Sequence, residues 1–476
     1  MSARTLTSLV FAVCLVALLL RVNTATMSGE MRKLVIEQQT YQELRELISD
    51  RYVGDEDRGE LRKQLFFGAI QGMSSVLDRH TAFWTPEQYD LEKTSTSGHF
   101  AGIGVEIAFD DQKGLVIITP LADYPAFKAG ILPDDRVIKI DDLPVDKLTP
   151  PEASKKIRGE PDTFVKLTIE REGVAEPLEF NIKRAIIKVQ SVQEAMLLQP
   201  PQSAAAHIPE DTPKIGYIQL AGFQQDTPED VARAVAQLEK AGMQGLILDL
   251  RQNPGGLLDA AVAICDQFLP EGVIVTTRER GAKNGEPGER IYRAEPKQNH
   301  VRIPMVVLID SRSASASEIV AGCLHDHSRA KLVGDKSYGK YSVQSIIPLQ
   351  LGQYGDGALK LTTARYYMPK SESIDGKGIE PDYKIAFTTD QLRGMLYERR
   401  LRRLAQNDPR PGNGKSIAPQ EAKTAEKTPP AEEKTKQGDG PKKEEEDAPP
   451  RKPEQPFVDL QIEKAVEVLS QELRGK

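Results

Sequence analysis

A serine run, a lysine and a glutamine lie close together in the sequence, between Ser313 and Gln344. An apolar run, residues 303–310, ends in the serine-rich segment 311–318, and the segment 339–344 opens the next apolar stretch. A serine hydroxyl at a strand-to-helix turn can attack an amide carbonyl when a neutral lysine amine takes its proton. The pattern therefore predicts a nucleophilic site for amide hydrolysis that needs no histidine.

Lys340 is the candidate general base of this site. An ordinary lysine, with a pKa of about 10.4, is almost always charged at neutral pH, so its pKa must fall to about 7–8 through desolvation or nearby positive charge. Lys340 follows Gly339, which adds no bulk, and precedes a half-apolar strand pattern. Because residues four apart on a strand share a face, we expect Gln344 to lie in the same pocket and to orient the amine.

The serine run lies where a predicted strand leads into a predicted helix. Backbone amides are unsatisfied at such a turn and the helix dipole favours negative charge, so the amide of Ala316 is a candidate oxyanion donor. A second donor is expected from Gly255 or Gly256, in another strand-to-helix turn where glycine permits close backbone approach. Spacing alone does not decide which of Ser313, Ser315 and Ser317 is the nucleophile, because an outer serine could simply cap the helix.

The histidines offer a competing site. His325 and His327 follow the serine run on the same predicted helix, but they lie about 200° apart around it, so they share no face for a metal or for a common carboxylate. His80 and His99 lack the spacing of metal ligands. We therefore predict no metal site and no cofactor.

Length and composition are those of a mainly globular chain. Its 476 residues can hold two or three domains. The net charge of -7 argues against a nucleic-acid-binding protein, which would show a basic face. Three cysteines, Cys14, Cys265 and Cys323, exclude a disulfide-built scaffold, and the last two are expected to pack in the core.

Residues 1–25 are predicted to be a signal peptide or a signal-anchor. Arg4 precedes an almost wholly apolar run, residues 6–20, which has about the length of a signal core and is short for a membrane span. A weak cleavage pattern follows at residues 23–25, so the sequence is compatible with cleavage and with retention as a membrane anchor. Either way we expect export, to the periplasm or cell envelope.

Two regions follow the signal. Residues 26–95 show apolar spacing typical of helices. Residues 96–185 alternate short β-rich runs with glycine and proline turns, which predicts a compact β-rich module with a helix near residues 151–158.

The rhythm then changes to strand, helix, strand, helix over residues 186–392, which predicts an α/β core with mostly parallel strands. Residues 407–455 are rich in Pro, Lys, Glu, Gly and Ala, and are predicted to be a disordered linker because they cannot bury enough apolar surface. Residues 456–476 regain helical periodicity, and we expect this helix to dock on its own chain or on a partner subunit.

With these motifs in view, the sequence resembles the carboxyl-terminal processing peptidases, also called tail-specific proteases. The resemblance covers about residues 40–390 and the last helix, and it rests on motifs that occur in the family's order. These motifs are Leu77-Asp-Arg-His-Thr81, Thr94-Ser-Thr-Ser-Gly98, Gly102-Ile-Gly-Val105, Ala126-Phe-Lys-Ala-Gly-Ile-Leu-Pro133, Ile157-Arg-Gly159, Asp249-Leu-Arg-Gln-Asn-Pro-Gly-Gly256, Ser311-Arg-Ser-Ala-Ser-Ala-Ser-Glu318, Gly339-Lys-Tyr-Ser-Val-Gln344, Leu361-Thr-Thr-Ala-Arg-Tyr-Tyr367 and Gly376-Lys-Gly-Ile-Glu-Pro-Asp382.

The resemblance implies a nucleophile at Ser315, a general base at Lys340 and an orienting partner at Gln344. It also implies a crotonase-like protease core with an inserted PDZ-like module that acts as a gate. Two departures from the family pattern stand out: Arg79 replaces a usual proline, and Tyr341 replaces a usual small residue.

In PDZ modules a glycine-containing loop captures the C-terminal carboxylate of a substrate while the substrate chain adds as a strand. By resemblance this role falls to Gly102, Ile103, Gly104 and Val105. Arg158, at the end of the module's helix, resembles a position that communicates with the active site; the alternative is a solvated cation at a helix end.

The prediction is therefore an exported serine endopeptidase that cleaves proteins near flexible C-terminal tails, and that could form a homodimer. One alternative is a catalytically silent PDZ scaffold that kept the protease fold, which would bind tail peptides without turnover. Another is an acyl-CoA enzyme of the crotonase type, for which the sequence shows no recognisable nucleotide-binding surface.

Overall fold

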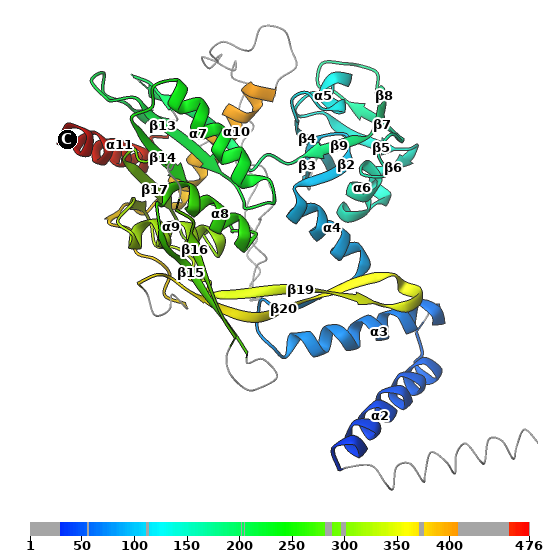
Figure 1. Ribbon diagram of the computed structural model, residues 1–476. Helices are drawn as coiled ribbons and strands as arrows, with labels where there is room; N and C mark the ends of the chain where they lie inside the picture. Colours follow the sequence, from blue (N-terminus) through cyan, green and yellow to red (C-terminus); the bar gives the residue numbers. More distant parts are fainter. Residues whose placement is uncertain are drawn as a thin grey trace, which may run out of the picture. The chain divides into compact units, whose positions relative to one another are not determined.

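The computed structural model describes residues 29–54, 57–110, 114–200, 202–203, 205–280, 288–296, 301–370, 376–407 and 457–475 (Figure 1). These residues form two compact units: one takes the residues up to Tyr89 together with Gln344–Thr362, and the other takes the rest. The predicted signal, residues 1–25, lies outside the described residues, and so does the predicted linker apart from its first residue. Among the helices described, none is at once long enough and apolar enough to span a membrane.

The first unit contains two helices, α2 (Gly29–Arg51) and α3 (Arg58–Ser75), and the short strand β1 (Ala82–Trp84). The side chain of Asp57 caps α3 by accepting hydrogen bonds from two backbone amides. Strand β1 pairs antiparallel with the first half of β20 (Asp356–Tyr367). Most of β19 (Ser342–Gln350), which also pairs with β20, belongs to this unit.

The β-rich module of the second unit is an antiparallel sheet with the strand order β3-β4-β5-β7-β8, and β6 pairs with β5. Its core consists of aliphatic side chains. Strands β2 and β9 form a separate antiparallel pair that precedes and follows the module in the chain. The elements here are α4 (Pro86–Ser97), β2 (His99–Gly102), β3 (Val105–Asp110), β4 (Gly114–Pro120), α5 (Pro125–Ala129), β5 (Arg136–Ile140), β6 (Leu143–Pro144), α6 (Pro150–Ile157), β7 (Phe164–Glu170), β8 (Leu178–Lys183) and β9 (Ala185–Lys188).

The second part of this unit is a mixed α/β fold around a mostly parallel sheet. Its strand order is β10-β13-β14-β17-β18-β21; β10 is antiparallel to β13, and the other neighbours are parallel. The strands are β10 (Val192–Leu198), β13 (Ile215–Leu220), β14 (Gly245–Asp249), β17 (Met305–Ile309), β18 (Lys331–Gly334) and β21 (Tyr383–Lys384). The central strands β13, β14, β17 and β18 are buried on both faces, apart from the exposed first residue of β18. This burial is expected for strands that helices cover on both sides.

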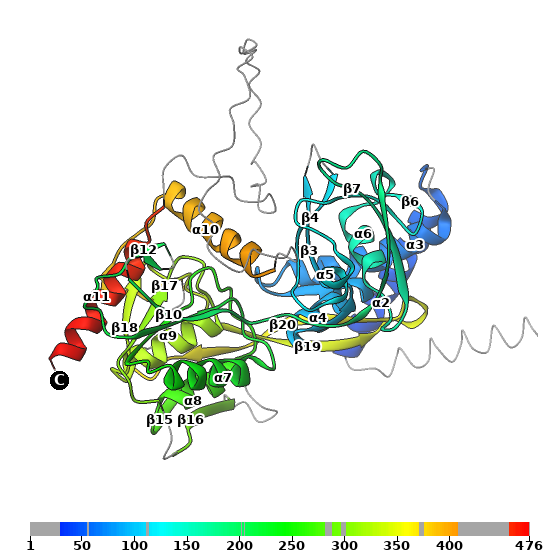
Figure 2. The ribbon, with the colours of Figure 1, turned by 90° about the horizontal axis from the view of Figure 1, so that it is seen from above.

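Successive residues of β17 face opposite cores. Val307 and Ile309 pack in the cluster that contains helices α7 (Thr227–Lys240), α8 (Leu258–Phe268) and α9 (Ala316–Asp326). Val306 and Leu308 pack in the cluster that contains α11 (Leu460–Arg474), so α11 covers the other face of the sheet (Figure 2). The C-terminal helix therefore docks on the sheet of its own chain.

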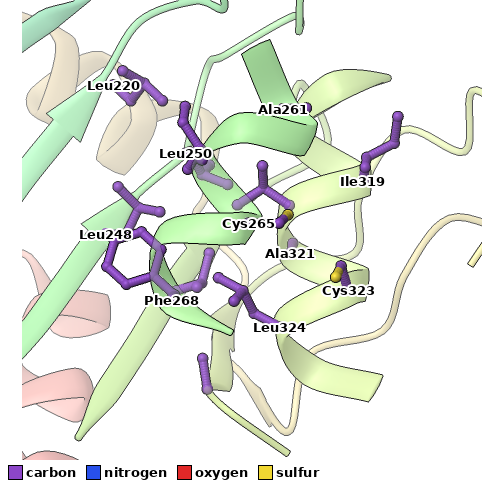
Figure 3. Close-up of a cluster of buried hydrophobic side chains, with 14 of the residues drawn as sticks. Leu220, Leu248, Leu250, Ala261, Cys265, Phe268, Ile319, Ala321, Cys323 and Leu324 are labelled. Carbon is purple, nitrogen blue, oxygen red and sulfur yellow. The ribbon is translucent and has the colours of Figure 1, made fainter. Parts of the chain in front are cut away.

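Further elements of this part of the chain are two strands and a helix. Strand β15 (Gly272–Glu279) pairs with β16 (Gly288–Ala294) and with the last residues of β20, and α10 (Thr389–Asn407) follows β21 in the chain. Cys265 on α8 and Cys323 on α9 are buried in the apolar cluster between these helices (Figure 3), as predicted. Burial raises the pKa of the Cys265 thiol well above its usual value, which keeps it unreactive.

Candidate active site

The structure separates the three candidate serines by their surroundings. Ser313 is fully buried, and its hydroxyl donates to the carbonyl of Leu250 (2.8 Å). Ser317 is also fully buried, and its hydroxyl donates to the carbonyl of Asn253 (2.9 Å). Both outer serines thus hold the neighbouring strand-to-helix turn in place, whereas Ser315 is only half-buried.

Ser315 immediately precedes helix α9, and its backbone is strained. With φ 57° and ψ -114° it lies in a region that non-glycine residues rarely adopt. A strained serine at a sharp strand-to-helix turn is the geometry of a nucleophile elbow, which presents the hydroxyl at the positive end of the helix dipole. The conformation therefore singles out Ser315 chemically from the serines on either side.

The carboxylate of Glu318 joins the serine turn to the lysine segment. Its Oε2 accepts hydrogen bonds from the backbone amides of both Ser315 (2.9 Å) and Lys340 (2.9 Å). Its Oε1 accepts from the Ser337 hydroxyl (2.6 Å) and the Gly339 amide (2.7 Å). Two segments more than twenty residues apart in sequence are thereby fixed on one buried side chain.

Burial raises the pKa of Glu318, and these hydrogen bonds from neutral donors offset only part of that effect. A second side chain bridges the same two segments: the Tyr366 hydroxyl donates to the carbonyl of Lys340 and lies 3.4 Å from the carbonyl of Ser315. Burial, and then the charge of Glu318, raise the pKa of Tyr366 well above its usual value, so the phenol stays protonated.

The turn after β14 lies against Ser315. Gly255 has φ 102°, and a Cβ placed on it would come within 2.9 Å of both the Cβ of Ser315 and the amide nitrogen of Ala316. Only glycine fits there. The amide of Gly255, however, donates to the side-chain oxygen of Asn253 (2.9 Å), so this predicted oxyanion donor is already engaged. Of the predicted pair, Gly256 is therefore the better candidate beside Ala316.

A buried ion network supports this turn from behind. Asp249, at the end of β14, accepts hydrogen bonds from Arg251 (2.6 Å), Arg399 (2.6 Å) and the Tyr217 hydroxyl (2.7 Å). Burial raises the pKa of Asp249, but the two guanidinium groups outweigh it and hold the pKa well below its usual value. The carboxylate stays ionised, and it can fix the chain where it leaves the sheet.

The network extends to the C-terminal segment. Arg251 is 1% exposed, and it donates to both carboxylate oxygens of Asp459 (3.0 Å each) and to the side chain of Gln461 (2.8 Å). Asp459 also caps α11 by accepting from the amide of Ile462. The docked C-terminal helix therefore contributes charge to the support of the turn that carries Gly255.

Lys340 and Gln344 do not lie on the single strand that the prediction of a shared face supposes. Lys340 is half-buried, but β19 begins only at Ser342, so the rule that residues four apart on a strand share a face does not apply to this pair. Tyr341 does not extend the strand either; its carbonyl accepts a hydrogen bond from the amide of Tyr366 (2.9 Å). Gln344 falls in the first unit, where its side-chain nitrogen donates to the Thr362 hydroxyl (3.1 Å).

The candidate carboxylate-binding loop is the turn between β2 and β3. The carbonyls of Ile103 and Gly104 accept hydrogen bonds from the amides of Ala126 (2.8 Å) and Leu121 (2.9 Å), which hold the turn against the module. Gly104 has φ 76°, and a Cβ there would lie 2.5 Å from the Cβ of Tyr124, so the turn requires glycine.

Arg158 lies close to this turn. A Cβ placed on Gly102 would come within 3.9 Å of the Arg158 Cα. The guanidinium stacks over the ring of Phe100, 4.8 Å from its centroid, and burial lowers the pKa of Arg158. Arg158 is therefore not a freely solvated cation at a helix end.

The histidines of α9 have other contacts. His325 lies 3.5 Å from the carboxylate of Asp382, and the ring of His327 makes a 2.7 Å hydrogen bond to the carbonyl of Val273. Within the described ranges, no group of three or more His, Cys, Asp or Glu side chains is arranged to hold a metal ion.

Comparison with known proteins identifies the family of this chain. Residues 214–385 match the model of peptidase family S41, and residues 116–171 match a PDZ domain. A carboxy-terminal-processing protease of Bartonella bacilliformis is 39% identical over 385 residues, which cover 76% of this chain and 82% of that protein. This chain belongs to peptidase family S41.

A second relative places this S41 peptidase in the same group. The carboxyl-terminal-processing protease of a Synechocystis species is 36% identical over 341 residues, covering 71% of this chain and 74% of that protein. Among solved structures, a photosystem II D1 C-terminal processing protease matches with 28% identity and a TM-score of 0.41, covering 74% of this chain and 93% of that one. The two family matches and the two relatives together show that the chain is a carboxy-terminal processing serine protease with a PDZ domain.

Sequence reasoning missed Glu318 as a member of the site of this S41 peptidase. The signal was present, because a serine followed three residues later by glutamate at the start of an apolar helix is the pattern of a capping box. What the pattern does not reveal is the set of three donors from residues 337–340, which only the fold brings to that carboxylate.

Proposed function

We propose that this chain is an exported serine endopeptidase that cleaves proteins near their C-terminal tails, with Ser315 as nucleophile and Lys340 as general base. One observation carries the proposal: the backbone amides of Ser315 and Lys340 bind the same oxygen of Glu318. This shared acceptor supports the proposal that the strained Ser315 and Lys340 act together. The hydroxyls of Ser313 and Ser317 are occupied in structural hydrogen bonds.

The proposed reaction is acyl transfer in two halves. The neutral amine of Lys340 takes the proton of the Ser315 hydroxyl as its oxygen attacks the scissile carbonyl. The amides of Ala316 and Gly256 stabilise the resulting oxyanion. Lys340 then returns the proton to the departing amine as the C–N bond breaks. In the second half, Lys340 deprotonates a water that attacks the ester, and the proton returns to Ser315 as the acid product leaves.

Gln344 completes the proposed site. A lysine that acts as a base must direct its lone pair at the serine. Another group therefore has to accept a hydrogen bond from one of its N–H groups. The side-chain oxygen of Gln344 is suited to this task because it accepts hydrogen bonds without carrying a charge that would stabilise the ammonium form.

The PDZ domain is proposed to deliver the substrate. The loop Gly102–Val105 would bind the terminal carboxylate of a flexible tail through backbone amides, while the tail adds as a strand. Arg158, stacked on Phe100 beside this loop, is proposed to respond to an occupied loop. This assigns proteins with flexible, apolar C-terminal tails as substrates.

Three broader elements also belong to the proposal. The mixed α/β core would be crotonase-like, and residues 1–25 would direct export to the periplasm or cell envelope, with membrane anchoring if they are retained. The mature protein could act as a homodimer. Fractionation of cells and sedimentation of the purified protein would test localisation and oligomeric state.

Cleavage of casein by purified full-length variants tests the catalytic assignment. We expect Ser315→Ala to reduce turnover by roughly 10⁴-fold or more, as removal of a nucleophile does. Ser311→Ala, which alters a neighbouring exposed serine, is the matched control and should retain activity. Substantial turnover by Ser315→Ala would refute the assignment. A wild-type protein that binds tail peptides but cleaves nothing would instead support the silent-scaffold alternative.

A pair of substrates tests the role of the tail. A flexible peptide with an apolar C-terminus should be cleaved with a higher kcat/KM than the same peptide with an amidated C-terminus. Amidation removes the charge that the loop would bind, and it leaves the scissile bond unchanged. Equal kcat/KM for both peptides would contradict carboxylate capture.

A further inference from the structure

The motif Leu77-Asp-Arg-His-Thr81 has no part in the reaction as described so far, yet it builds an ordered polar turn in the first unit. The Oδ1 of Asp78 accepts hydrogen bonds from the amides of His80 (2.8 Å) and Thr81 (3.0 Å), and its Oδ2 accepts from the Thr81 hydroxyl (3.1 Å). A third donor to Oδ1 comes from far away in the sequence, the hydroxyl of Thr362 (3.2 Å).

Thr362 lies between this turn and Gln344. Its hydroxyl accepts a hydrogen bond from the side-chain nitrogen of Gln344 (3.1 Å), and its amide donates to the Thr81 hydroxyl (3.2 Å). The pairing of β1 with β20, in which Ala82 lies opposite Lys360, fixes the two segments in register. All of these residues belong to the same compact unit.

The chain of hydrogen bonds has a fixed direction. Burial opposes ionisation of Asp78, but hydrogen bonds from His80, Thr362 and Thr81 outweigh it and keep the pKa of Asp78 below its usual value, so the group only accepts. Thr362 therefore gives its single proton to Asp78. Having no proton left, its oxygen can only accept from Gln344, which must turn its NH₂ group toward Thr362 and its oxygen away.

We propose that Asp78 is a positioning residue for the protease reaction: through Thr362 it sets which end of the Gln344 carboxamide is available to the catalytic amine. This rests on the proposed function. With this orientation Gln344 presents its oxygen, the acceptor that the proposed mechanism requires. The reversed orientation would present N–H groups, which compete with the Ser315 hydroxyl for the lone pair of the amine.

Variants of Asp78 in the full-length protein test the direction of this chain. Asp78→Ala leaves the Thr362 proton free to bind the Gln344 oxygen, and we expect kcat to fall by about 10- to 100-fold with KM nearly unchanged. Asp78→Asn keeps an oxygen that can accept from Thr362, so it should restore most of kcat. Asp57→Ala removes another exposed aspartate that caps backbone amides in the same unit, and it should match wild type in kcat.

A second pair of variants leaves the Asp78 turn intact in case Asp78→Ala does not fold. Thr362→Val removes the hydroxyl and should lower kcat, whereas Thr362→Ser keeps it and should not. The proposal is overturned if Asp78→Ala has the kcat of Asp57→Ala, if Asp78→Asn is as impaired as Asp78→Ala, or if Thr362→Val equals Thr362→Ser.

Two further variants separate this inference from the proposed function. In a Gln344→Ala background, Asp78→Ala should add less than about a twofold loss, because the group it orients is gone. An unchanged 10- to 100-fold loss in that background would overturn the positioning role while leaving the protease assignment intact. A fully active Gln344→Ala protein would also overturn it, and only activity of Ser315→Ala would overturn the serine mechanism itself.

Discussion

The turns that follow strands β14 and β17 each bury a carboxylate, and they hold it in opposite ways. Asp249, after β14, is surrounded by the guanidinium groups of Arg251 and Arg399. Glu318, after β17, accepts only from neutral donors, three backbone amides and a serine hydroxyl. Both carboxylates are fully buried, but the pKa of Asp249 is lowered and that of Glu318 is raised.

The difference shows two uses of a buried acid. Ion pairs around Asp249 tie the start of the turn that carries Gly256 to the C-terminal segment with Asp459, so a strong charge there serves the scaffold behind the site. Glu318 lies one helical turn from Ser315. An arginine beside its carboxylate would stabilise the ionised form, but it would occupy oxygen lone pairs that now accept from the backbone amides of Ser315 and Lys340. Neutral donors let one carboxylate hold both segments.

The largest expected effect comes from the first turn. Asp249→Ala leaves two buried guanidinium groups without their shared partner, and we expect a loss of about 3–5 kcal/mol in the free energy of unfolding. Urea denaturation of the full chain measures it. Asp142→Ala, which removes an exposed partner of Lys166, should cost less than about 1 kcal/mol. Equal losses for the two variants would show that the network around Asp249 is not stabilising.

At the second turn the effect should appear in activity as well as stability. Glu318→Gln replaces one accepting oxygen with an NH₂ group that faces two donors, which costs about 1–3 kcal/mol in unfolding free energy. Because the Ser315 and Lys340 segments lose part of their shared anchor, we also expect kcat for casein cleavage to fall. A variant destabilised to this extent but with wild-type kcat would contradict the positioning role of Glu318.

Gln461→Ala tests the part of the Asp249 network that lies in the C-terminal segment. Arg251 loses one neutral acceptor but keeps both carboxylates, and the carbonyl of Ile385 loses the donor it has in Gln461. We expect a loss of about 1–2 kcal/mol in unfolding free energy. A loss as large as that of Asp249→Ala would mean that the C-terminal segment, rather than the ion pair next to the turn, dominates the network.

The two acids should also give opposite dependences of stability on pH. The folded-state pKa of Asp249 is depressed, so the unfolded chain binds the proton first as pH falls through the usual value of 3.8, and the contribution of Asp249 is lost toward lower pH. The folded-state pKa of Glu318 is raised, so the folded chain keeps the proton longer and stability falls as pH rises above the usual value of 4.5.

Urea unfolding between pH 3 and 7 separates these contributions. Relative to wild type, Asp249→Asn should weaken the loss of stability on the acid side, and Glu318→Gln should weaken the loss on the side above pH 4.5. For Asp249 the range covers less than one pH unit below 3.8, so the change is about 1 kcal/mol at most, since one pKa unit corresponds to about 1.4 kcal/mol. If both variants changed the slope of unfolding free energy against pH in the same direction, the assignment of the two pKa shifts would be contradicted.

Much of the architecture could be predicted because its signals are local. The alternation of strands and helices predicted over residues 186–392 corresponds to the mostly parallel sheet and to helices α7, α8 and α9. Lys340 shows the limit of such reasoning. The predicted shared face requires Lys340 and Gln344 to lie on one strand, but β19 begins at Ser342, and the backbone amide of Lys340 donates to Glu318.

The sequence by itself determined the family, the kinds of elements and the residue types of the site, since periodicity, glycine turns and motif order are properties of neighbouring residues. Only the tertiary structure decided that Ser313 and Ser317 are occupied, that the amide of Gly255 is engaged by Asn253, and that Asp78 is linked to Gln344. Each of these facts depends on which donor meets which acceptor, and hydrogen-bond partners separated by tens or hundreds of residues meet only when the chain has folded.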